Sequence, residues 1–380
     1  MRLICLAVVA ILFRLPVPSI ATTGLVDVTE YGADGTDTQP DDVAIEKAIK
    51  VALTKNLPLY FPAGTFRITR TIVLDFHNKN VGIVGDGMHA TIIEIDEGRW
   101  KPEDKVAIYS RTCAATFRDF SLTGSRKIKL NGILFNFYGG HGTHRNIKVN
   151  HFNGFGVKYV AIWDAYVENL IIENCGSQQE WAFSVHGGHD TSNHTTFNRL
   201  QVELAHDKAM YVDASSLNLV FIGIHSERLI RESSSSQDVS HHLRGGSCSY
   251  LNARIENTKS VSRILLGNAS GSYTDFRCGG QIVEVSYGAR TSQQINNLVC
   301  RSLIIPADNL SQVLFENAHV SGTVAIRRQI ENYPTFKNCT FRGPIENSGN
   351  ASKAVFVDCN VKDTQSLARA KGINIVRSSF

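Results

Sequence analysis

The stretches FKNCTF at 336–341 and FVDCNV at 356–361 decide the fold. Both place apolar residues at their first, fourth and sixth positions, and they begin 20 residues apart. The same spacing recurs upstream, in copies that begin at residues 117, 144, 167, 197, 219, 248, 273, 295 and 315. Eleven copies at intervals of 20 to 30 residues indicate a solenoid, in which each repeat stacks on its neighbours.

Each copy is short, rich in Val, Ile, Phe and Leu, and free of helical periodicity, so it predicts a β-strand. Three short strands with their turns fit into about 20 to 25 residues. We therefore expect an all-β protein, a right-handed single-stranded parallel β-helix of about eleven coils. An ordinary β-sandwich is the alternative. Because a solenoid grows by adding coils to one core, residues 22–380 are expected to form a single domain.

The first 21 residues, MRLICLAVVAILFRLPVPSIA, have the layout of a secretory signal peptide. Arg2 precedes an apolar run, and small residues lead to a cleavage point after Ala21. An uncleaved anchor is the alternative, but Arg14 interrupts the run. A secreted or periplasmic protein is therefore expected. No segment reaches the length of a membrane span.

Charge and cysteine placement limit the partners and cross-links. Removal of Arg2 and Arg14 lowers the formal net charge from +4 to +2, which is too weak to favour nucleic acid binding. We expect no nucleic acid and no membrane as partners. Four cysteines occupy inward positions of the repeat, which predicts stacked thiols in the core: Cys278, Cys300, Cys339 and Cys359.

Residues 27–95 differ from the repeat. DVTEYGADGTDTQPDDVAIEKAIKVA at 27–52 predicts a strand, a turn, and a helix with Pro40 and Asp41 in its first turn. LPLYFPAGTFRITRTIVL at 57–74 and VGIVGDGMHATIIEI at 81–95 predict further strands, with turns at PAG and GDG. This order resembles the N-terminal segment of the pectate-lyase-like β-helix superfamily.

The resemblance implies that residues 22–95 form an N-terminal cap and first coil, in which the helix covers open strand edges. The superfamily includes polysaccharide lyases, glycoside hydrolases, uronan epimerases and phage tailspikes, so the fold does not select one activity. A monomer and a homotrimer both stay open.

A second set of strands lies between the copies: GILFNF at 132, GVKYVA at 156, AFSVHG at 182, AMYVDA at 209, RLIRES at 228 and RILLGN at 263. Side chains alternate along a strand, so one column is expected to point inward: Ile133, Val157, Phe183, Met210, Leu229 and Ile264. An outward column then reads Asn136, Val160, His186, Asp213, Glu232 and Gly267. Neighbouring strands lie about 4.8 Å apart, so His186, Asp213 and Glu232 should stand within about 10 Å.

Other polar and aromatic residues are expected beside this column. The neighbouring outward column contains Lys158, Ser184 and Tyr211, and Trp163 and Trp181 could stack on a sugar. The turns that enter these strands add Glu203, His206, Asp207, His225, Glu227 and Arg228. Ten of the 13 histidines lie between His141 and His242, and the two longest repeat intervals surround the same coils, which favours a functional groove. A solvated surface ladder is the alternative.

These residues predict a secreted enzyme that cleaves an extended, acidic polysaccharide. The candidate catalytic residues are His186, Tyr211, Asp213 and Glu232. In a glycoside hydrolase, Asp213 and Glu232 would be the carboxylate pair. In a lyase, His186 or Tyr211 would take a proton, while Lys158 or Arg228 neutralised the developing charge. A non-catalytic glycan-binding β-helix and a uronan epimerase are the alternatives.

The candidate substrate-binding residues are Lys158, Trp163, Trp181, Glu203, His206, Asp207, His225, Glu227 and Arg228. We expect no cofactor. Calcium is left open at Asp164 and Asp190, which could equally cap turns. The HxxH spacings of His141 with His144 and of His186 with His189 are only a weak zinc signal, because they do not share a helix face.

Overall fold

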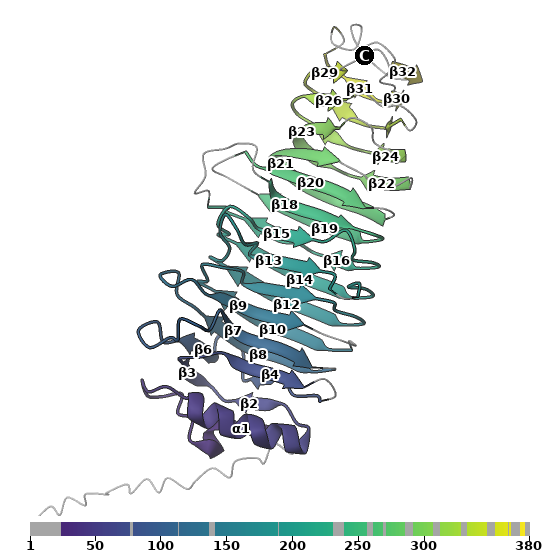
Figure 1. The fold of residues 1–380 in the computed structure, drawn as a ribbon. Coiled ribbons are helices and arrows are strands. Elements are labelled where there is room, and N and C mark those ends of the chain that lie inside the picture. The colour runs from purple at the N-terminus through teal and green to yellow at the C-terminus, as the bar shows by residue number, and fades with distance from the viewer. Residues whose placement is uncertain are drawn as a thin grey trace, which may run out of the picture.

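The computed structural model describes residues 24–76, 79–112, 114–136, 141–188, 190–230, 239–256, 261–268, 271–285, 292–306, 312–327, 333–347, 354–363, 365 and 373–376. Within these residues every strand pairing is parallel, and the strands stack into one elongated solenoid of about eleven coils (Figure 1). The predicted all-β solenoid is confirmed. The predicted signal peptide lies outside the described residues. In the part of the chain that is described, no helix is long and apolar enough to span a membrane.

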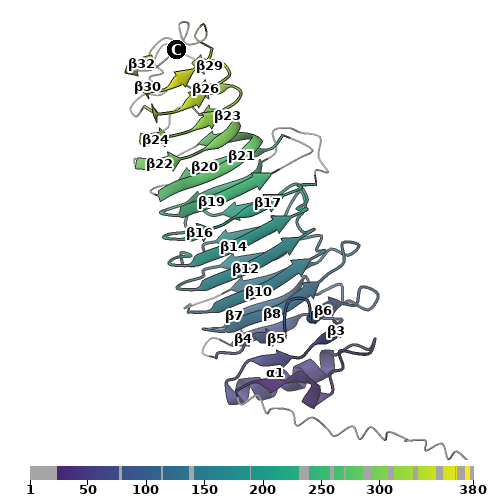
Figure 2. The same ribbon diagram turned by 180° about the vertical axis from the view of Figure 1, so that it is seen from behind.

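The copies of the repeat form one continuous surface of stacked strands, which we call the repeat ladder (Figure 2). Its strands are β8 (Thr116–Thr123), β10 (Thr143–Asn150), β12 (Tyr166–Glu173), β14 (Thr196–Glu203), β16 (Val220–Ile222), β17 (His225–Glu227), β19 (Ser249–Glu256), β21 (Gly271–Val285), β22 (Ser292–Asn296), β23 (Val299–Ile305), β24 (Gln312–Glu316), β25 (His319–Val320), β27 (Thr335–Lys337), β28 (Thr340–Phe341), β30 (Ala354–Val357), β31 (Asn360–Val361) and β32 (Ile373–Val376).

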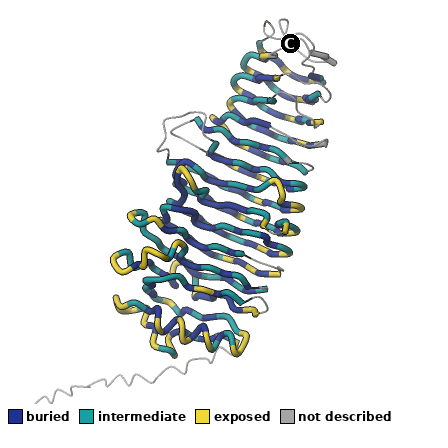
Figure 3. Tube along the Cα trace, in the orientation of Figure 1, coloured by how far each residue is buried: buried dark blue, intermediate teal, exposed yellow. Residues whose placement is uncertain are grey.

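The strands between the copies form a second ladder. They are β4 (Ile72–Phe76), β7 (Val106–Thr112), β9 (Asn131–Asn136), β11 (Val157–Val160), β13 (Phe183–His186), β15 (Met210–Val212), β18 (Val239–Gly245), β20 (Arg263–Asn268), the last residues of β21 and β23, β26 (Val324–Ile326) and β29 (Ile345–Asn347). Buried residues run through both ladders along the length of the solenoid (Figure 3).

A bend at the third position of each copy lets one repeat supply two strand directions. The residue at this position has a positive φ: Asp119, Asn146, Asn169, Arg199, Gly223, Asn252, Asp275, Asn297, Asn317, Asn338 and Asp358. Gly, Asn and Asp adopt this conformation at the least cost. Their side chains also link coils, because the amide of Asn146 donates to Asp119 at 2.7 Å and that of Asn169 donates to Asn146 at 2.9 Å.

Two copies were placed in the wrong register. Phe197 pairs with Phe221, and Phe221 pairs with Tyr250, so these copies begin at 221 and 250 rather than at 219 and 248. The apolar spacing favoured the wrong register because the sixth position of the copy at 221 is the buried Ser226, and because Leu219 and Cys248 are also buried. The correct register stacks the aromatic rings, with centroids 4.7 Å apart for Phe197 and Phe221 and 4.9 Å apart for Phe221 and Tyr250.

The N-terminal end is built from β1 (Val26–Asp27), the 3-10 helix η1 (Val28–Tyr31), α1 (Asp42–Lys55), β2 (Leu59–Phe61), β3 (Gly64–Ile68), β5 (Ile83–Gly85) and β6 (Thr91–Ile95). Helix α1 lies across this end of the solenoid (Figure 1). It begins after Asp41, so Pro40 and Asp41 precede it, contrary to prediction. The Asp41 carboxylate instead accepts from the backbone of Asp34 and of Arg67, both at 2.8 Å, which ties the helix start to β3. The capping role of α1 stays a prediction.

The four cysteines expected in the core are buried thiols, as predicted. Cys278 and Cys300 are register partners on neighbouring coils, and Cys339 and Cys359 lie between paired residues of the last repeats. These small apolar side chains fill the inward column without a disulfide.

Candidate active site

The outward side chains of the second ladder converge where Tyr211 lies. Lys158, Ser184, Tyr211 and His242 are register partners on four successive strands, β11, β13, β15 and β18. His186 and Arg244 follow two residues later on β13 and β18, and Asp213 directly follows the end of β15. We call these seven residues the ladder site.

The strand after β15 is not the one that the sequence predicted. RLIRES at 228 was aligned there, but Met210 pairs with His241, so β18 takes this place. Arg244 therefore occupies the position expected for Glu232, which lies outside the described residues. Leu229 is buried, yet His241 holds the inward position assigned to it.

The error has a physical cause. His241 points inward and breaks the apolar alternation of β18, so this strand did not match the others in the sequence. Its imidazole is satisfied inside the core, with Nδ1 2.9 Å from Ser240 Oγ and Nε2 3.0 Å from Ser226 Oγ. The spacing in the sequence already argues against this alignment. Each earlier repeat copy begins 12 to 15 residues before its second-ladder strand, whereas the copy at 219 begins only nine residues before the strand assigned at 228.

Aromatic rings pack around Tyr211. Its ring stacks on His186 with centroids 4.9 Å apart, and His242 meets it edge-on at 4.8 Å. Trp181 lies 5.4 Å from Tyr211. These contacts hold the phenol between two imidazoles and beside an indole, and they orient all four rings on one outward surface.

Burial and charge set the protonation of these groups. Burial and then Lys158 lower the pKa of His186 to about 4, while Asp213 opposes them. Burial and then Arg244 lower the pKa of His242 to about 4, again against Asp213. Burial and then Asp213 raise the pKa of Tyr211. Near neutral pH both imidazoles are therefore neutral proton acceptors and the phenol keeps its proton.

Two lysines add positive charge beside aromatic rings at the start of these strands. The Lys208 ammonium lies 5.6 Å from the Trp181 ring centroid, and that of Lys158 lies 5.7 Å from the Phe155 centroid. With Arg244 they add three cations to the surface that carries the Asp213 carboxylate. This surface favours an anionic ligand with faces that can stack on aromatic rings.

Other predicted residues form a separate cluster on the repeat ladder. Glu203 and Glu227 are register partners, and Arg228 pairs with both, at 3.0 and 2.7 Å. His225 lies 3.6 Å from Glu227.

His225, Glu227 and Glu256 hold their ligand atoms within 4.8 Å of one another. Arg228 and Arg254 already neutralise the two carboxylates. Calcium takes six to eight oxygen ligands, so this arrangement does not favour it.

The turn residues His206 and Asp207 are buried rather than open to a ligand. Nε2 of His206 lies 2.8 Å from Asn174 Oδ1, which joins two successive turns. Trp163 lies past the end of β11, where its indole donates to the Thr191 carbonyl. These three predicted substrate-binding residues therefore stand apart from the rings around Tyr211.

The possible zinc and calcium ligands named from the sequence do not come together as a metal site among the described residues. His144 is buried with Nδ1 2.9 Å from Tyr159 Oη, whereas His141 is exposed, so this pair does not converge. His189 lies outside the described residues. Asp190 accepts from the Thr191 backbone at 2.7 Å, as a turn cap does. Asp164 lies 4.0 Å from His141.

A family model described as "Rhamnogalacturonase A/epimerase, pectate lyase-like" matches residues 25–101. The protein has the pectate-lyase-like parallel β-helix fold. The matched residues are those whose turn and helix signatures suggested it. No curated protein matches the chain.

The solved structures that resemble this chain include proteins of bacteria and phages. The catalytic unit of a thermostable GH87 α-1,3-glucanase from Streptomyces thermodiastaticus is 13% identical, with a TM-score of 0.55 over 94% of this chain and 69% of that one. The gp42 tailspike of Acinetobacter phage vb_AbaP_AS12 is 11% identical, with a TM-score of 0.55 over 89% and 63%. ORF18 of Geobacillus virus E2 is 16% identical with a TM-score of 0.43, and the chain spans 60% of its length. At these identities the likeness shows the fold alone.

Proposed function

We propose that the protein is a secreted lyase that cleaves an acidic polysaccharide by β-elimination, with the glycan lying along the second ladder. The observation that carries this proposal is the composition of the ladder site. It combines a protonated phenol, two neutral imidazoles and two cations with one carboxylate. These are the groups that proton removal beside a carboxylate requires.

In this reaction His186 removes the proton from the carbon that bears the uronate carboxylate. Negative charge develops on that carboxylate, and Arg244 and Lys158 neutralise it. Tyr211, which stacks on His186 and keeps its proton, donates to the leaving glycosidic oxygen. Arg228, which the sequence suggested as the neutralising cation, is engaged with Glu203 and Glu227.

A glycoside hydrolase is the second candidate because the fold is shared with a glucanase. Hydrolysis needs two carboxylates that flank the scissile bond. Asp213 supplies one, but the residue that follows its paired strand segment on β18 is Arg244, and Glu232 lies outside the described residues. The ladder site therefore supports elimination better than hydrolysis.

A uronan epimerase is the third candidate, because the name of the matching family model includes an epimerase. It would use the same acid and base but return a proton to the same carbon without breaking the chain. Product analysis separates the three reactions. Elimination gives an ultraviolet-absorbing unsaturated uronate, hydrolysis gives reducing ends without it, and epimerisation changes only the uronate composition.

The test incubates the full chain with a panel of polyuronates and records unsaturated products by ultraviolet absorbance. Tyr211→Phe, which removes the proton donor, should reduce kcat by about two to four orders of magnitude while the fold is kept. Glu316→Gln is the matched control, because this carboxylate pairs with Lys337 on a distant coil, and it should keep full activity.

Two results would overturn the assignment. Full activity in Tyr211→Phe would remove the ladder site as the catalytic centre. A glycan that binds but is never altered would favour the non-catalytic binding protein instead.

A further inference from the structure

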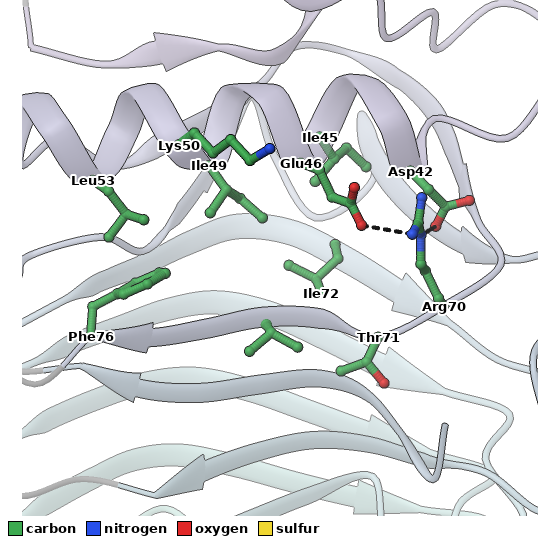
Figure 4. Close-up of a pocket in the computed structure, with 11 residues that line it drawn as sticks. Asp42, Ile45, Glu46, Ile49, Lys50, Leu53, Arg70, Thr71, Ile72 and Phe76 are labelled. Atoms are coloured by element: carbon green, nitrogen blue, oxygen red, sulfur yellow. Dashed lines mark ion pairs between the residues drawn. The ribbon is translucent and has the colours of Figure 1, made fainter. Parts of the chain in front are cut away.

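A cavity of about 280 Å³ lies between α1 and β4, away from the ladder site (Figure 4). Its apolar walls are Ile45, Ile49 and Leu53 from the helix and Ile72, Val73 and Phe76 from the strand. An apolar cavity of about 150 Å³ is enough to bind benzene, so this one can hold a ring or an alkyl chain.

Two carboxylates and two cations line the cavity. Arg70 lies 2.8 Å from Glu46 and 3.9 Å from Asp42, so its guanidinium is engaged with both carboxylates at one end of the cavity (Figure 4). Lys50 also lines the cavity, and within the described residues its ammonium forms no ion pair. The cavity therefore combines apolar walls with a cation at its rim.

Val73 connects this cavity to the ladder site. It is 47% exposed and begins the same outward row of the second ladder, which continues through Tyr109, Leu134, Lys158, Ser184 and Tyr211. Five strand steps of about 4.8 Å separate Val73 from Tyr211, a distance of about 24 Å. A glycan chain along this row would therefore reach the cavity several sugar units from the reacting bond.

We propose that this cavity binds an alkyl or acyl group carried by an acidic sugar. The apolar walls take the chain, and Lys50 attracts the carboxylate of the sugar. The shared row places such a group at the remote end of the glycan, a step that rests on the proposed function. Binding to the cavity itself does not depend on turnover.

The probe is octyl β-glucuronide, and glucuronate is its matched comparison without the chain. Affinities are measured on the full protein by calorimetric titration. Octyl glucuronide should bind at least tenfold more tightly than glucuronate. Val73→Asp should weaken octyl glucuronide at least tenfold, because it places a charge in the apolar wall without disturbing a buried position.

Val43→Asp is the control, because it is the same substitution at a residue that is 58% exposed on α1 and does not line the cavity. This variant should bind octyl glucuronide with the same affinity as the unmodified protein. Lys50→Gln should lower the affinity for octyl glucuronide about threefold to tenfold. Equal binding by Val73→Asp and Val43→Asp, or no preference for the octyl chain, would overturn the proposal.

The two proposals fail separately. Tyr211→Phe should lose turnover of a polyuronate but retain octyl glucuronide binding. If no polyuronate is cleaved but Val73→Asp still abolishes octyl glucuronide binding, the proposed function falls and the cavity stands as a binding site.

Discussion

Tyr211 and His186 show how neighbours in a ladder set the chemistry of one residue. Each side chain lies about 4.8 Å from its register partners, so a charge one strand away acts on it directly. Lys158 is one strand from the coil of His186 and lowers its pKa, whereas Asp213 acts in the opposite direction on the next coil. The order of charges along the coils therefore determines which group is the base.

This order predicts the acid limb of the pH profile. His186 must be neutral to accept a proton, so kcat/KM should stay constant from pH 8 down to about pH 5 and fall below about pH 4. Lys158→Met removes a cation that lowers the pKa of His186, so the acid limb should move to higher pH. Lys208→Met, whose ammonium lies over Trp181, should leave the limb in place. An unmoved limb in Lys158→Met would argue against His186 as the base.

Arg199 is the bend residue of the repeat that is not Asn, Asp or Gly. Its φ is 59°, in a row where neighbouring coils have Asn169 and Gly223. A left-handed backbone costs most residues about 1 to 2 kcal/mol, and Asn less. Arg199→Asn should therefore raise the free energy of unfolding by about 0.5 to 1 kcal/mol, measured by denaturant titration. Arg199→Ala is the control and should show no such gain; equal stability of the two variants would contradict this account.

At the scale of the elements, stacked side chains inside the coils replace the packing of separate layers. Phe336 is fully buried, with its ring centroid 4.8 Å from both Phe315 and Phe356. Each coil therefore completes the core of the next, which is why the repeat spacing is so regular in the sequence.

Phe336→Ala should remove contacts on both sides at once and lower the free energy of unfolding by about 3 to 5 kcal/mol. Lys337→Ala is the control on the adjacent residue, because its ion pair with Glu316 is at the surface and should contribute little to stability. Both variants should keep the activity of the folded fraction, since the ladder site lies several coils away. A small loss in Phe336→Ala would mean that these coils relax around the cavity.

Apolar spacing predicted the solenoid and most of the second ladder because every coil repeats the same inward pattern. It could not fix the register of the copy near Phe221, because a buried serine, Ser226, interrupts the apolar spacing there. Gly223 and Asn252 at the bend indicate the correct register, since Gly and Asn adopt a left-handed backbone at the least cost. The sequence predicted the residues of the ladder site on β11, β13 and β15, including Asp213. It missed His242 and Arg244, because the inward His241 interrupts the apolar alternation by which a strand such as β18 is recognised.

At the scale of the whole molecule, histidines with a lowered pKa couple the stability of the solenoid to pH; His186 and His242 contribute down to about pH 4, and two core histidines contribute further. His144 and His241 are buried in the core, and burial lowers the pKa of each to about 3. Both imidazoles lie within hydrogen-bonding distance of core hydroxyl groups, so the folded chain holds them neutral. In the unfolded chain each would titrate near pH 6.5.

Acid should therefore begin to destabilise the fold at a pH above the range in which carboxylates titrate. Between about pH 6.5 and pH 3 the unfolded chain binds protons that the folded chain excludes. The free energy of unfolding therefore decreases as the pH is lowered, by about 1.4 kcal/mol per pH unit for each histidine. Above pH 6.5 their contribution is fully present. His144→Phe, which suits the aromatic stack with Phe117 and Phe135, should reduce this slope in denaturation series at pH 4 to 7. His319→Gln, outside the core on β25, is the control and should leave the slope unchanged; the same slope in His144→Phe would place the acid sensitivity elsewhere.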